Sequence, residues 1–325
     1  MSDRIRWGVL STGYIATMFA KDLRLLPDAD LVAVGSRSTE AAERFAAAHG
    51  VARAYGSWQA LVEDPEVDAI YVATPHTAHY EASMLALRAG KAVLCEKPFT
   101  LAVAESEEMI ATARAGGVFL MEAMWMRCIP AIRRMVELVG DGAIGEPVAV
   151  HADFGMQGPF PETSRLRDRE LGGGALYDVG IYPVTFAHLF LGAPASVQAW
   201  ARMSAGGVDE NTGLLFGYDS GAVAALTCSL LGDSARTGTV TGTLGRIDVK
   251  RDFFHPHGFT LWRGGAVEEF TLPYEGAGYQ FEAAEVHRCL REGLLESPLV
   301  PLDSTLGILR LLAEISGKIG LDYSS

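Results

Sequence analysis

The stretch IRWGVLSTGYIA, residues 5–16, decides the fold of this 325-residue chain. It opens with an apolar, partly β-branched run and continues into apolar residues at helical spacing. The junction, Ser11-Thr12-Gly13-Tyr14-Ile15-Ala16, is a degenerate G-x-G-x-x-G/A turn in which serine replaces the first glycine. Such a turn directs backbone amides and a helix N-terminus toward a pyrophosphate. It therefore predicts a dinucleotide site, with a purely structural turn before a helix as the alternative.

Strand-like segments alternate with helical patterns from this turn to residue 124, which is the order that builds a parallel sheet covered on both faces. We expect strands at 5–10, 31–35, near 54, 69–73, 92–95 and 118–121, and helices at 13–25, 39–48, 57–62, 76–89 and 101–115. The fold class is therefore α/β, with a doubly wound Rossmann domain over residues 1–124.

The pattern changes after residue 124. We expect strands at 147–154, 196–203, 212–216, 223–229, 237–241 and 259–262, separated by Gly, Asp and Ser, and helices at 175–191, 281–292 and 304–319. This pattern predicts an α+β domain over residues 125–325 with an open, mostly antiparallel sheet. One face of that sheet would be available to a partner.

Composition and charge restrict the partners. The formal net charge of −13 is spread over the chain without long single-sign blocks, which argues against nucleic acid and anionic membranes. The four cysteines, Cys95, Cys128, Cys228 and Cys289, are far apart and lack metal or disulfide spacing. The N-terminus has no apolar leader, and no stretch approaches the roughly 18 apolar residues of a membrane span. These features predict a cytoplasmic, unprocessed protein.

The residues after the second expected strand, Ser36-Arg37-Ser38, bear on the choice of cofactor. An acidic residue there would bind the ribose 2'-hydroxyl of NAD, whereas an arginine accommodates the 2'-phosphate of NADP. Arg37 can clamp a phosphate or stack on adenine, and Ser36 can donate a hydrogen bond. The sequence therefore favours NADP and leaves NAD open. The alternative is a solvated Arg37, and Ser38 is expected to be a helix N-cap in either case.

Glu96-Lys97-Pro98 follows the fifth expected strand, at the edge where open α/β sheets bind their ligands. Lys97 can donate to a substrate oxygen and stabilise the anionic form of a neighbouring acid. Pro98 fixes the backbone, with a cis bond as one option. The alternative is an ordinary surface pair of Glu96 and Lys97.

Three glycines at 172–174 precede Asp178 and Tyr182, which are four residues apart and so project from one face of a helix. A tyrosine beside a lysine ammonium can exchange a proton with a substrate hydroxyl. On the residues alone, a buried core phenol and a structural carboxylate are the alternative interpretation.

Several motifs together resemble the glucose-fructose oxidoreductase / inositol dehydrogenase / MocA family. They are the 8–16 loop, the run Tyr71–His79, Glu96-Lys97-Pro98 and the 172–182 block, and the resemblance covers essentially the whole chain. Other stretches, such as Met121-Glu-Ala-Met-Trp125, are similar to the dimeric dihydrodiol dehydrogenases and NADP-linked D-xylose 1-dehydrogenases of this family. Many relatives carry histidine at the position of Tyr182, so the chain resembles the tyrosine-type members.

The resemblance implies roles for individual residues. Lys97 and Tyr182 would carry the proton transfer, with Asp178 orienting the substrate or the tyrosine. A basic residue that relatives often carry four positions after Arg37 is Ala41 here, which weakens the implied NADP preference. The implied cofactor contacts are Ser11, Thr12, Gly13, Tyr14, Ile15, Ser36, Arg37, Thr74, Pro75, His76, His79, Glu96, Lys97 and Trp125.

Aromatic side chains suit the substrate pocket, because their faces fit both sugars and arene diols. We place Trp125, Phe154 and Tyr279 at the substrate with Asp178 and Tyr182. Phe160 and Phe254 are further candidates, and any of these rings can instead fill the core or a dimer interface. His76 and His79 lack a third ligand nearby in sequence, so we expect no metal.

These features predict reversible transfer of a hydride between a nicotinamide and a carbinol carbon of a sugar, with an aldose at C1 preferred, or of a cyclic trans-diol. The alternatives are a ketosugar reductase of deoxysugar metabolism and a non-catalytic NADP-binding sensor. The resemblance also implies a homodimer formed through the open C-terminal sheet.

Overall fold

The computed structural model describes residues 4–158, 160–161 and 163–323, which form two compact units. The first unit runs through Cys128 and also contains Glu275–Leu306. The second unit contains Ile129–Tyr274 and continues from Gly307. The segment 275–306 thus packs with the N-terminal part of the chain, whereas we expected every residue from 125 onward in one C-terminal domain.

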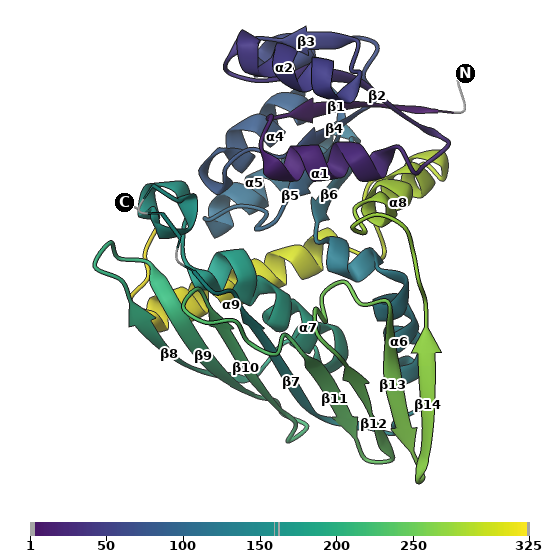
Figure 1. Cartoon of the computed structure of the whole chain (residues 1–325), viewed down its shortest axis with the longest axis vertical. Coiled ribbons are helices and arrows are strands. Elements are labelled where there is room, and N and C mark those ends of the chain that lie inside the picture. Colours follow the sequence, from purple (N-terminus) through teal and green to yellow (C-terminus); the bar gives the residue numbers. More distant parts are fainter. Residues whose placement is uncertain (1–3, 159, 162, 324–325) are drawn as a thin grey trace. The chain divides into compact units, whose positions relative to one another are not determined.

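A six-stranded parallel sheet forms the centre of the first unit, in the order β3-β2-β1-β4-β5-β6 (Figure 1). The strands are β1 (Ile5–Leu10), β2 (Ala29–Gly35), β3 (Arg53–Tyr55), β4 (Ala69–Val72), β5 (Ala92–Glu96) and β6 (Leu120–Ala123). Strands β4, β5 and β6 are buried along their whole length, as parallel strands covered on both faces should be. The doubly wound prediction is confirmed, and the carboxyl ends of β1 and β4 flank the topological switch point.

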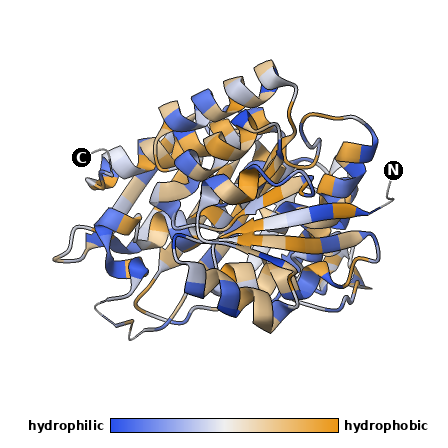
Figure 2. Cartoon of the chain, turned by 90° about the horizontal axis from the view of Figure 1, so that it is seen from above, coloured by the Kyte–Doolittle hydropathy of each residue, from blue (hydrophilic) through white to orange (hydrophobic). Residues whose placement is uncertain are grey.

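Helices cover both faces of this sheet. They are α1 (Tyr14–Leu23), α2 (Thr39–His49), α3 (Trp58–Val62), α4 (His79–Arg88), α5 (Val103–Gly116) and α8 (Gln280–Arg291). Side chains of α4 and α5 pack on the face that carries Leu10 and Ile70. On the opposite face Phe19 of α1 stacks on Tyr71, with 3.9 Å between the ring centroids. In Figure 2 the strands near the middle of the view are mainly hydrophobic, and the surrounding helices carry both colours.

Polar contacts attach α8 to the first unit. Trp7 Nε1 donates to His287 Nε2 at 2.9 Å, and His287 Nδ1 lies 3.1 Å from Asp28 Oδ2. Because Nε2 accepts from Trp7, the network places the ring proton on Nδ1, which donates to Asp28. Asp22 accepts from the backbone N–H groups of residues 277–279, just before the helix. These contacts join residues that are far apart in the chain, so no local pattern could assign α8 to this unit.

The second unit contains an eight-stranded sheet in the order β14-β13-β12-β11-β7-β10-β9-β8. Its strands are β7 (Pro147–Gly155), β8 (Ser196–Met203), β9 (Asp209–Gly217), β10 (Val223–Ser229), β11 (Gly238–Gly242), β12 (Gly245–Val249), β13 (Gly258–Arg263) and β14 (Ala266–Thr271). The pair β7–β10 is parallel and the other pairs are antiparallel, so the mostly antiparallel prediction is confirmed. We did not expect β12 or β14. β12 has only 5 residues, and all but one residue of β14 is exposed, so β14 shows no alternation of buried and exposed side chains.

One face of this sheet is covered by α7 (Ile181–Leu191), which packs against β7, β10 and β11 (Figure 1). α9 (Leu302–Ile319) appears where we expected a helix, whereas α6 (Pro130–Gly140) was missed. Strands β8, β9 and β10 also carry exposed apolar side chains, among them Trp200, which is 70% exposed, Leu215 and Val223. Over the described residues, none of the helices is both long and apolar enough to cross a bilayer.

Candidate active site

The turn between β1 and α1 is built as an anion site. Gly13 is the N-cap of α1, and across the described part of the chain no side chain caps this helix and no acidic residue lies in its first turn. Ser11 adopts φ 113°, in the left-handed region that favours glycine, at the position where the usual motif has its first glycine. Such a conformation costs about 1–3 kcal/mol for a residue with a side chain. The first-turn amides and the positive end of the helix dipole are therefore left to a ligand.

The turn after β2 lies beside the turn after β1, because Ser11 N–H donates to Gly35 O at 2.9 Å. Arg37 is exposed, and its guanidinium lies 5.9 Å from the centroid of the Trp58 ring. Ser38 accepts from Ala41 N–H at 3.2 Å, which confirms it as the N-cap of α2. Arg37 thus presents a cation at the edge of the sheet where the first-turn amides of α1 point.

The turn after β4 places Thr74, Pro75 and His76 at the same edge. Thr74 is buried, and among the described residues its Oγ1 has no hydrogen-bond partner. A buried unpaired hydroxyl is costly in a folded protein, so this one fits a polar ligand such as the ribose of a dinucleotide. His76 is also buried, and its ring meets that of His79 edge-on at 5.6 Å.

His79 lies between two backbone carbonyl groups, and its expected contact with the cofactor stays a prediction. Its side chain is fully buried, with Nδ1 at 2.8 Å from Pro98 O and Nε2 at 3.0 Å from Thr74 O. Burial lowers the pKa of His79 to about 4, although the two carbonyl contacts favour the charged form. A neutral imidazole donates through one nitrogen at a time. The neutral ring therefore donates to one of these two carbonyls at a time, while it packs between the turn after β4 and the turn after β5.

The Glu96-Lys97-Pro98 turn holds its glutamate inward. Tyr71 Oη donates to Glu96 Oε1, and Lys97 N–H donates to Glu96 Oε2 at 3.1 Å. The Lys97–Pro98 bond is cis, which was one of the options read from the sequence. Glu96 is buried and Lys97 is half-buried. Glu96 therefore supports the turn, while Lys97 carries its cation at the end of the strand.

Trp125 and Tyr279 come together in the first unit. Their rings stack with 4.5 Å between centroids and 16° between planes. Tyr279 precedes α8, and its backbone N–H donates to Asp22 at 3.0 Å. Two residues assigned to the substrate from sequence therefore form one aromatic pair within the first unit, although we expected both in the domain over residues 125–325.

Buried carboxyl groups near these strand ends are a feature that the sequence did not reveal. Glu282 of α8 is fully buried, and within the described ranges neither of its oxygens has a hydrogen-bond partner. Burial, followed by the nearby Glu96, Asp22 and Glu122, raises the pKa of Glu282 well above its ordinary value. Burial also raises the pKa of Glu122 to about 7. Burial thus favours the neutral form of Glu282, which avoids a further charge beside Glu96.

In the second unit, a π-helical turn, Leu176–Gly180, leads into α7 and carries Asp178. Such turns occur frequently at functional sites. Asp209 Oδ2 accepts from Leu176 N–H at 2.9 Å and so fixes the start of the turn. Arg165 Nη2 donates to Asp178 Oδ1 at 2.7 Å. Arg165 was missed from sequence, because it lies in an irregular segment before the three glycines.

Tyr182 lies in an aromatic cluster of the second unit. Its ring is 5.5 Å from that of Phe154 and 5.1 Å from that of Phe254, and these two phenyl rings stack on each other at 4.3 Å. Phe154, Phe254 and Tyr182 are all largely buried. Phe154, Phe254 and Tyr182, all candidates from the sequence, therefore lie together in the second unit.

The remaining candidates for chemistry are groups of possible metal ligands and the four cysteine thiols. Residues 4–158, 160–161 and 163–323 contain no group of three or more His, Cys, Asp or Glu side chains arranged to hold a metal ion. The four cysteines are free and buried, and burial raises the pKa of the Cys95 and Cys228 thiols. Buried thiols of this kind are poor nucleophiles.

Comparison with known proteins identifies the class. Residues 5–124 match the GFO/IDH/MocA oxidoreductase family with an NAD-binding Rossmann fold, and residues 132–248 match the GFO/IDH/MocA C-terminal domain. The chain belongs to this family. It is an oxidoreductase that uses a nicotinamide dinucleotide.

Individual relatives are similar over nearly their whole length. The chain is 38% identical to the trans-1,2-dihydrobenzene-1,2-diol dehydrogenase of Mus musculus, over 98% of both chains. Among solved structures, it resembles a 3-ketoreductase from Actinomadura kijaniata in complex with NADP and TDP-benzene, with 30% identity, a TM-score of 0.86 and 97% and 98% coverage. It also resembles an aldose-aldose oxidoreductase from Caulobacter crescentus, with 26% identity, a TM-score of 0.88 and 97% coverage of each chain.

Proposed function

We propose that this chain is an NADP(H)-dependent dehydrogenase that oxidises, and in reverse reduces, a carbinol carbon of a sugar or a cyclic trans-diol. The proposal rests mainly on the carboxyl edge of the first sheet, where the uncapped N-terminus of α1 and the exposed Arg37 belong to adjacent turns. Amides of this kind bind a pyrophosphate, and an arginine beside them binds a 2'-phosphate. Bound NADP supplies the hydride acceptor.

Three sets of residues would hold the dinucleotide. Ser11 to Ile15 would bind the pyrophosphate through backbone amides, and Ser36 with Arg37 would bind the adenosine phosphate. Thr74 and its neighbours would bind the ribose, which gives the buried Thr74 Oγ1 a partner. Trp125 would lie at the nicotinamide end, where its stacking on Tyr279 holds the indole ring in one orientation.

Lys97 and Tyr182 would move the proton. The hydride of the carbinol carbon would pass to NADP, the Tyr182 phenolate would take the hydroxyl proton, and the Lys97 ammonium would stabilise charge on the same oxygen. The products are a carbonyl compound, NADPH and one proton. Asp178, held by Arg165 at 2.7 Å, would orient the substrate hydroxyls.

The substrate class is supported by both the relatives and the aromatic side chains. The relative from Mus musculus is named as a dihydrodiol dehydrogenase, and the relative from Caulobacter crescentus is named as an aldose-aldose oxidoreductase. Both names denote compounds with neighbouring hydroxyl or ring oxygens. A phenyl pair beside Tyr182 suits the apolar face of such a ring. A ketosugar reductase is the second candidate, favoured by the 3-ketoreductase with its nucleotide-linked ligand.

The direct test is NADPH absorbance with excess NADP and a panel of D-xylose, D-glucose, L-arabinose, a trans-cyclohexanediol and inositol. We expect turnover of an aldose or of the trans-diol, and loss of that turnover in the double variant Lys97→Met, Tyr182→Phe. Tight NADP binding without turnover of any compound would instead favour the ketosugar reductase or a silent sensor. Full turnover by the double variant would contradict the assigned proton path.

We further propose that two copies associate through the uncovered face of the second sheet in a reducing, cytoplasmic compartment. Trp200, Leu215 and Val223 give that face exposed apolar area, and the four thiols are free. Sedimentation velocity should give a dimer for the wild type and a monomer for Trp200→Glu. A monomeric wild type at micromolar concentration would exclude the dimer.

A further inference from the structure

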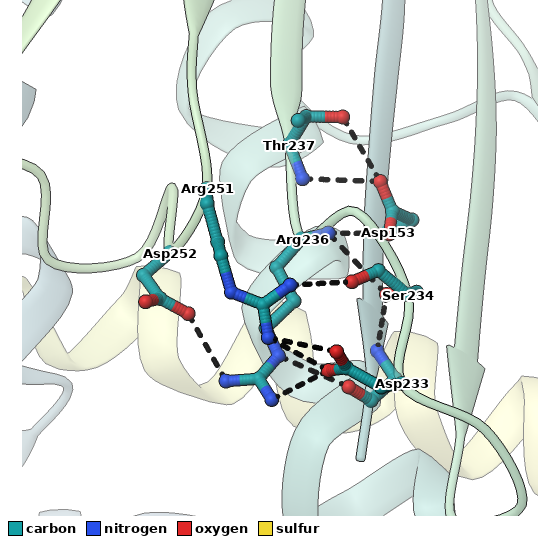
Figure 3. Close-up of polar contacts among 8 residues, drawn as sticks. Asp153, Asp233, Ser234, Arg236, Thr237, Arg251 and Asp252 are labelled. Carbon is teal, nitrogen blue, oxygen red and sulfur yellow. Dashed lines mark hydrogen bonds and ion pairs between the residues drawn. The ribbon is translucent and has the colours of Figure 1, made fainter. Parts of the chain in front are cut away.

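A polar cluster at one end of β7 has no place in the proposed proton path. It joins β7, the connection from β10 to β11 and the segment after β12, and Arg236 lies at its centre (Figure 3). We propose that Arg236 is a positioning residue for Tyr182, because it connects the two chain segments whose phenyl rings pack against the tyrosine. This inference rests on the proposed function of Tyr182.

The guanidinium of Arg236 makes contacts in three directions. Nε donates to Gly155 O at 3.1 Å, Nη1 donates to Asp252 Oδ1 at 3.1 Å, and Nη2 donates to Asp233 Oδ1 at 2.8 Å. The side chain is only 23% exposed. A rigid, planar fork is suited to such a junction, whereas a lysine ammonium lacks its fixed geometry.

The backbone of Arg236 is held as firmly as its side chain. Its N–H donates to Asp153 Oδ2 at 2.8 Å, and its φ of 53° lies in the left-handed region. Asp153 also accepts from the N–H and the hydroxyl of Thr237, at 3.1 and 3.0 Å. Burial would raise the pKa of Asp153, but the hydrogen bonds from Ser234, Thr237 and Arg236 lower it overall. Asp153 is therefore an ionised anchor at neutral pH.

The contacts of Arg236 adjoin the aromatic cluster. Gly155 follows Phe154 in the chain, and Asp252 lies two residues before Phe254. The guanidinium carbon of Arg236 also lies 5.6 Å from the Phe154 ring centroid. Because Phe154 and Phe254 stack on each other and both contact Tyr182, the distance that Arg236 sets between their segments also sets where the phenol lies.

Arg251 offers a matched control in the same cluster. Its Nη2 donates to both Asp233 oxygens, at 2.8 and 3.0 Å, and its Nη1 donates to Ser234 O at 3.0 Å. It is more exposed than Arg236, at 49%. Both arginines pair with Asp233, but in the described structure only Arg236 also bonds Gly155 and Asp252. A comparison of the two variants separates the connection to the aromatic cluster from the loss of a positive charge.

The experiment compares Arg236→Met, Arg236→Lys and Arg251→Met with the wild type by two measurements. The first is the NMR resonance of Tyr182 in protein labelled at the tyrosine ζ carbon, assigned as the peak missing from Tyr182→Phe. The second is kcat, KM and the NADP dissociation constant with a substrate found in the panel. Thermal unfolding shows whether each variant is folded.

We expect both Arg236 variants to shift or broaden the Tyr182 resonance and to lower kcat by about 10- to 100-fold, as small misplacements of a reacting group do. NADP affinity should be unchanged, and Arg251→Met should resemble the wild type in all respects. A Tyr182 resonance and kcat in folded Arg236→Lys equal to those of Arg251→Met would overturn the proposal, even if Arg236→Met does not fold.

The same set of proteins distinguishes failure of the inference from failure of the proposed function. If Tyr182→Phe turns over normally, the function assigned to Tyr182 is wrong, yet the NMR comparison still tests the link from Arg236 to the ring. If Tyr182→Phe is inactive while Arg236→Lys behaves like Arg251→Met, the function stands and the positioning role of Arg236 falls.

Discussion

The two units offer different kinds of groups to a ligand. At the carboxyl edge of its sheet, the first unit presents backbone: an uncapped helix N-terminus and turns held by the buried His79 and Glu96. The second unit presents side chains, with Asp178 held by Arg165 and Tyr182 packed among phenyl rings. Backbone amides recognise a phosphate wherever the fold recurs, whereas packed side chains can vary with the substrate.

The largest effect we expect in the first unit comes from His79. Its pKa of about 4 in the folded protein lies below the unfolded value of 6.5. The unfolded state therefore binds more protons between these values, and the stability due to neutral His79 is lost as the pH falls from about 6.5 to 4. The loss amounts to about 3 kcal/mol.

Urea unfolding between pH 4 and 7 checks this expectation. His79→Gln should be less stable than the wild type at pH 7 and should lose less stability toward pH 4. The exposed His151 is the control, and His151→Gln should keep the wild-type dependence. An unchanged slope in His79→Gln would show that the turns of the first unit do not depend on this ring.

Arg37 should show a smaller effect, confined to one cofactor. Arg37→Ala is expected to raise the NADP dissociation constant about 10- to 100-fold, the range for a lost charge-assisted hydrogen bond, and to change NAD binding little. Calorimetric titration of both dinucleotides measures this difference, with the exposed Arg88→Ala as the control. Equal weakening of NAD and NADP would assign Arg37 to adenine stacking instead of phosphate binding.

Ser11 should show the smallest effect and in the opposite direction. Because its φ of 113° suits glycine, Ser11→Gly removes strain and loses only part of that gain to the flexible unfolded chain. We expect a gain of about 1 kcal/mol in the free energy of unfolding. Ser36→Gly, at a position without positive φ, should instead destabilise the apo protein. A destabilised Ser11→Gly would mean that the serine hydroxyl matters more than the backbone.

The first unit was largely predictable because its signals are local. Strand and helix alternate along the chain, and the β1 turn, Ser38 and the Glu96-Lys97-Pro98 turn each lie within a few residues of their partners. The packing of 275–306 with the first unit was not predictable, for the opposite reason. α8 is attached through His287 and Asp22, whose partners are far away in sequence and leave no periodic trace.

The second unit shows the same limit in its candidate site. Tyr182 and Asp178 stood out through their spacing after three glycines, and the resemblance to a known family supplied their roles. Arg165 and Arg236 did not stand out, because each lies in an irregular segment and acts through tertiary contacts. Exposed strands such as β14 were missed, since without a buried face a strand shows no alternation.

The role of Tyr182 is tested most directly by measuring NADPH formation and NADP affinity on the same samples of wild type and Tyr182→Phe. We expect Tyr182→Phe to keep the NADP dissociation constant of the wild type and to lose about 100- to 10,000-fold in kcat with an aldose or a trans-diol. Wild-type turnover by Tyr182→Phe would contradict the assignment of proton transfer to Tyr182. NADP binding that depends on the phenol would contradict the assignment of cofactor binding to the first unit.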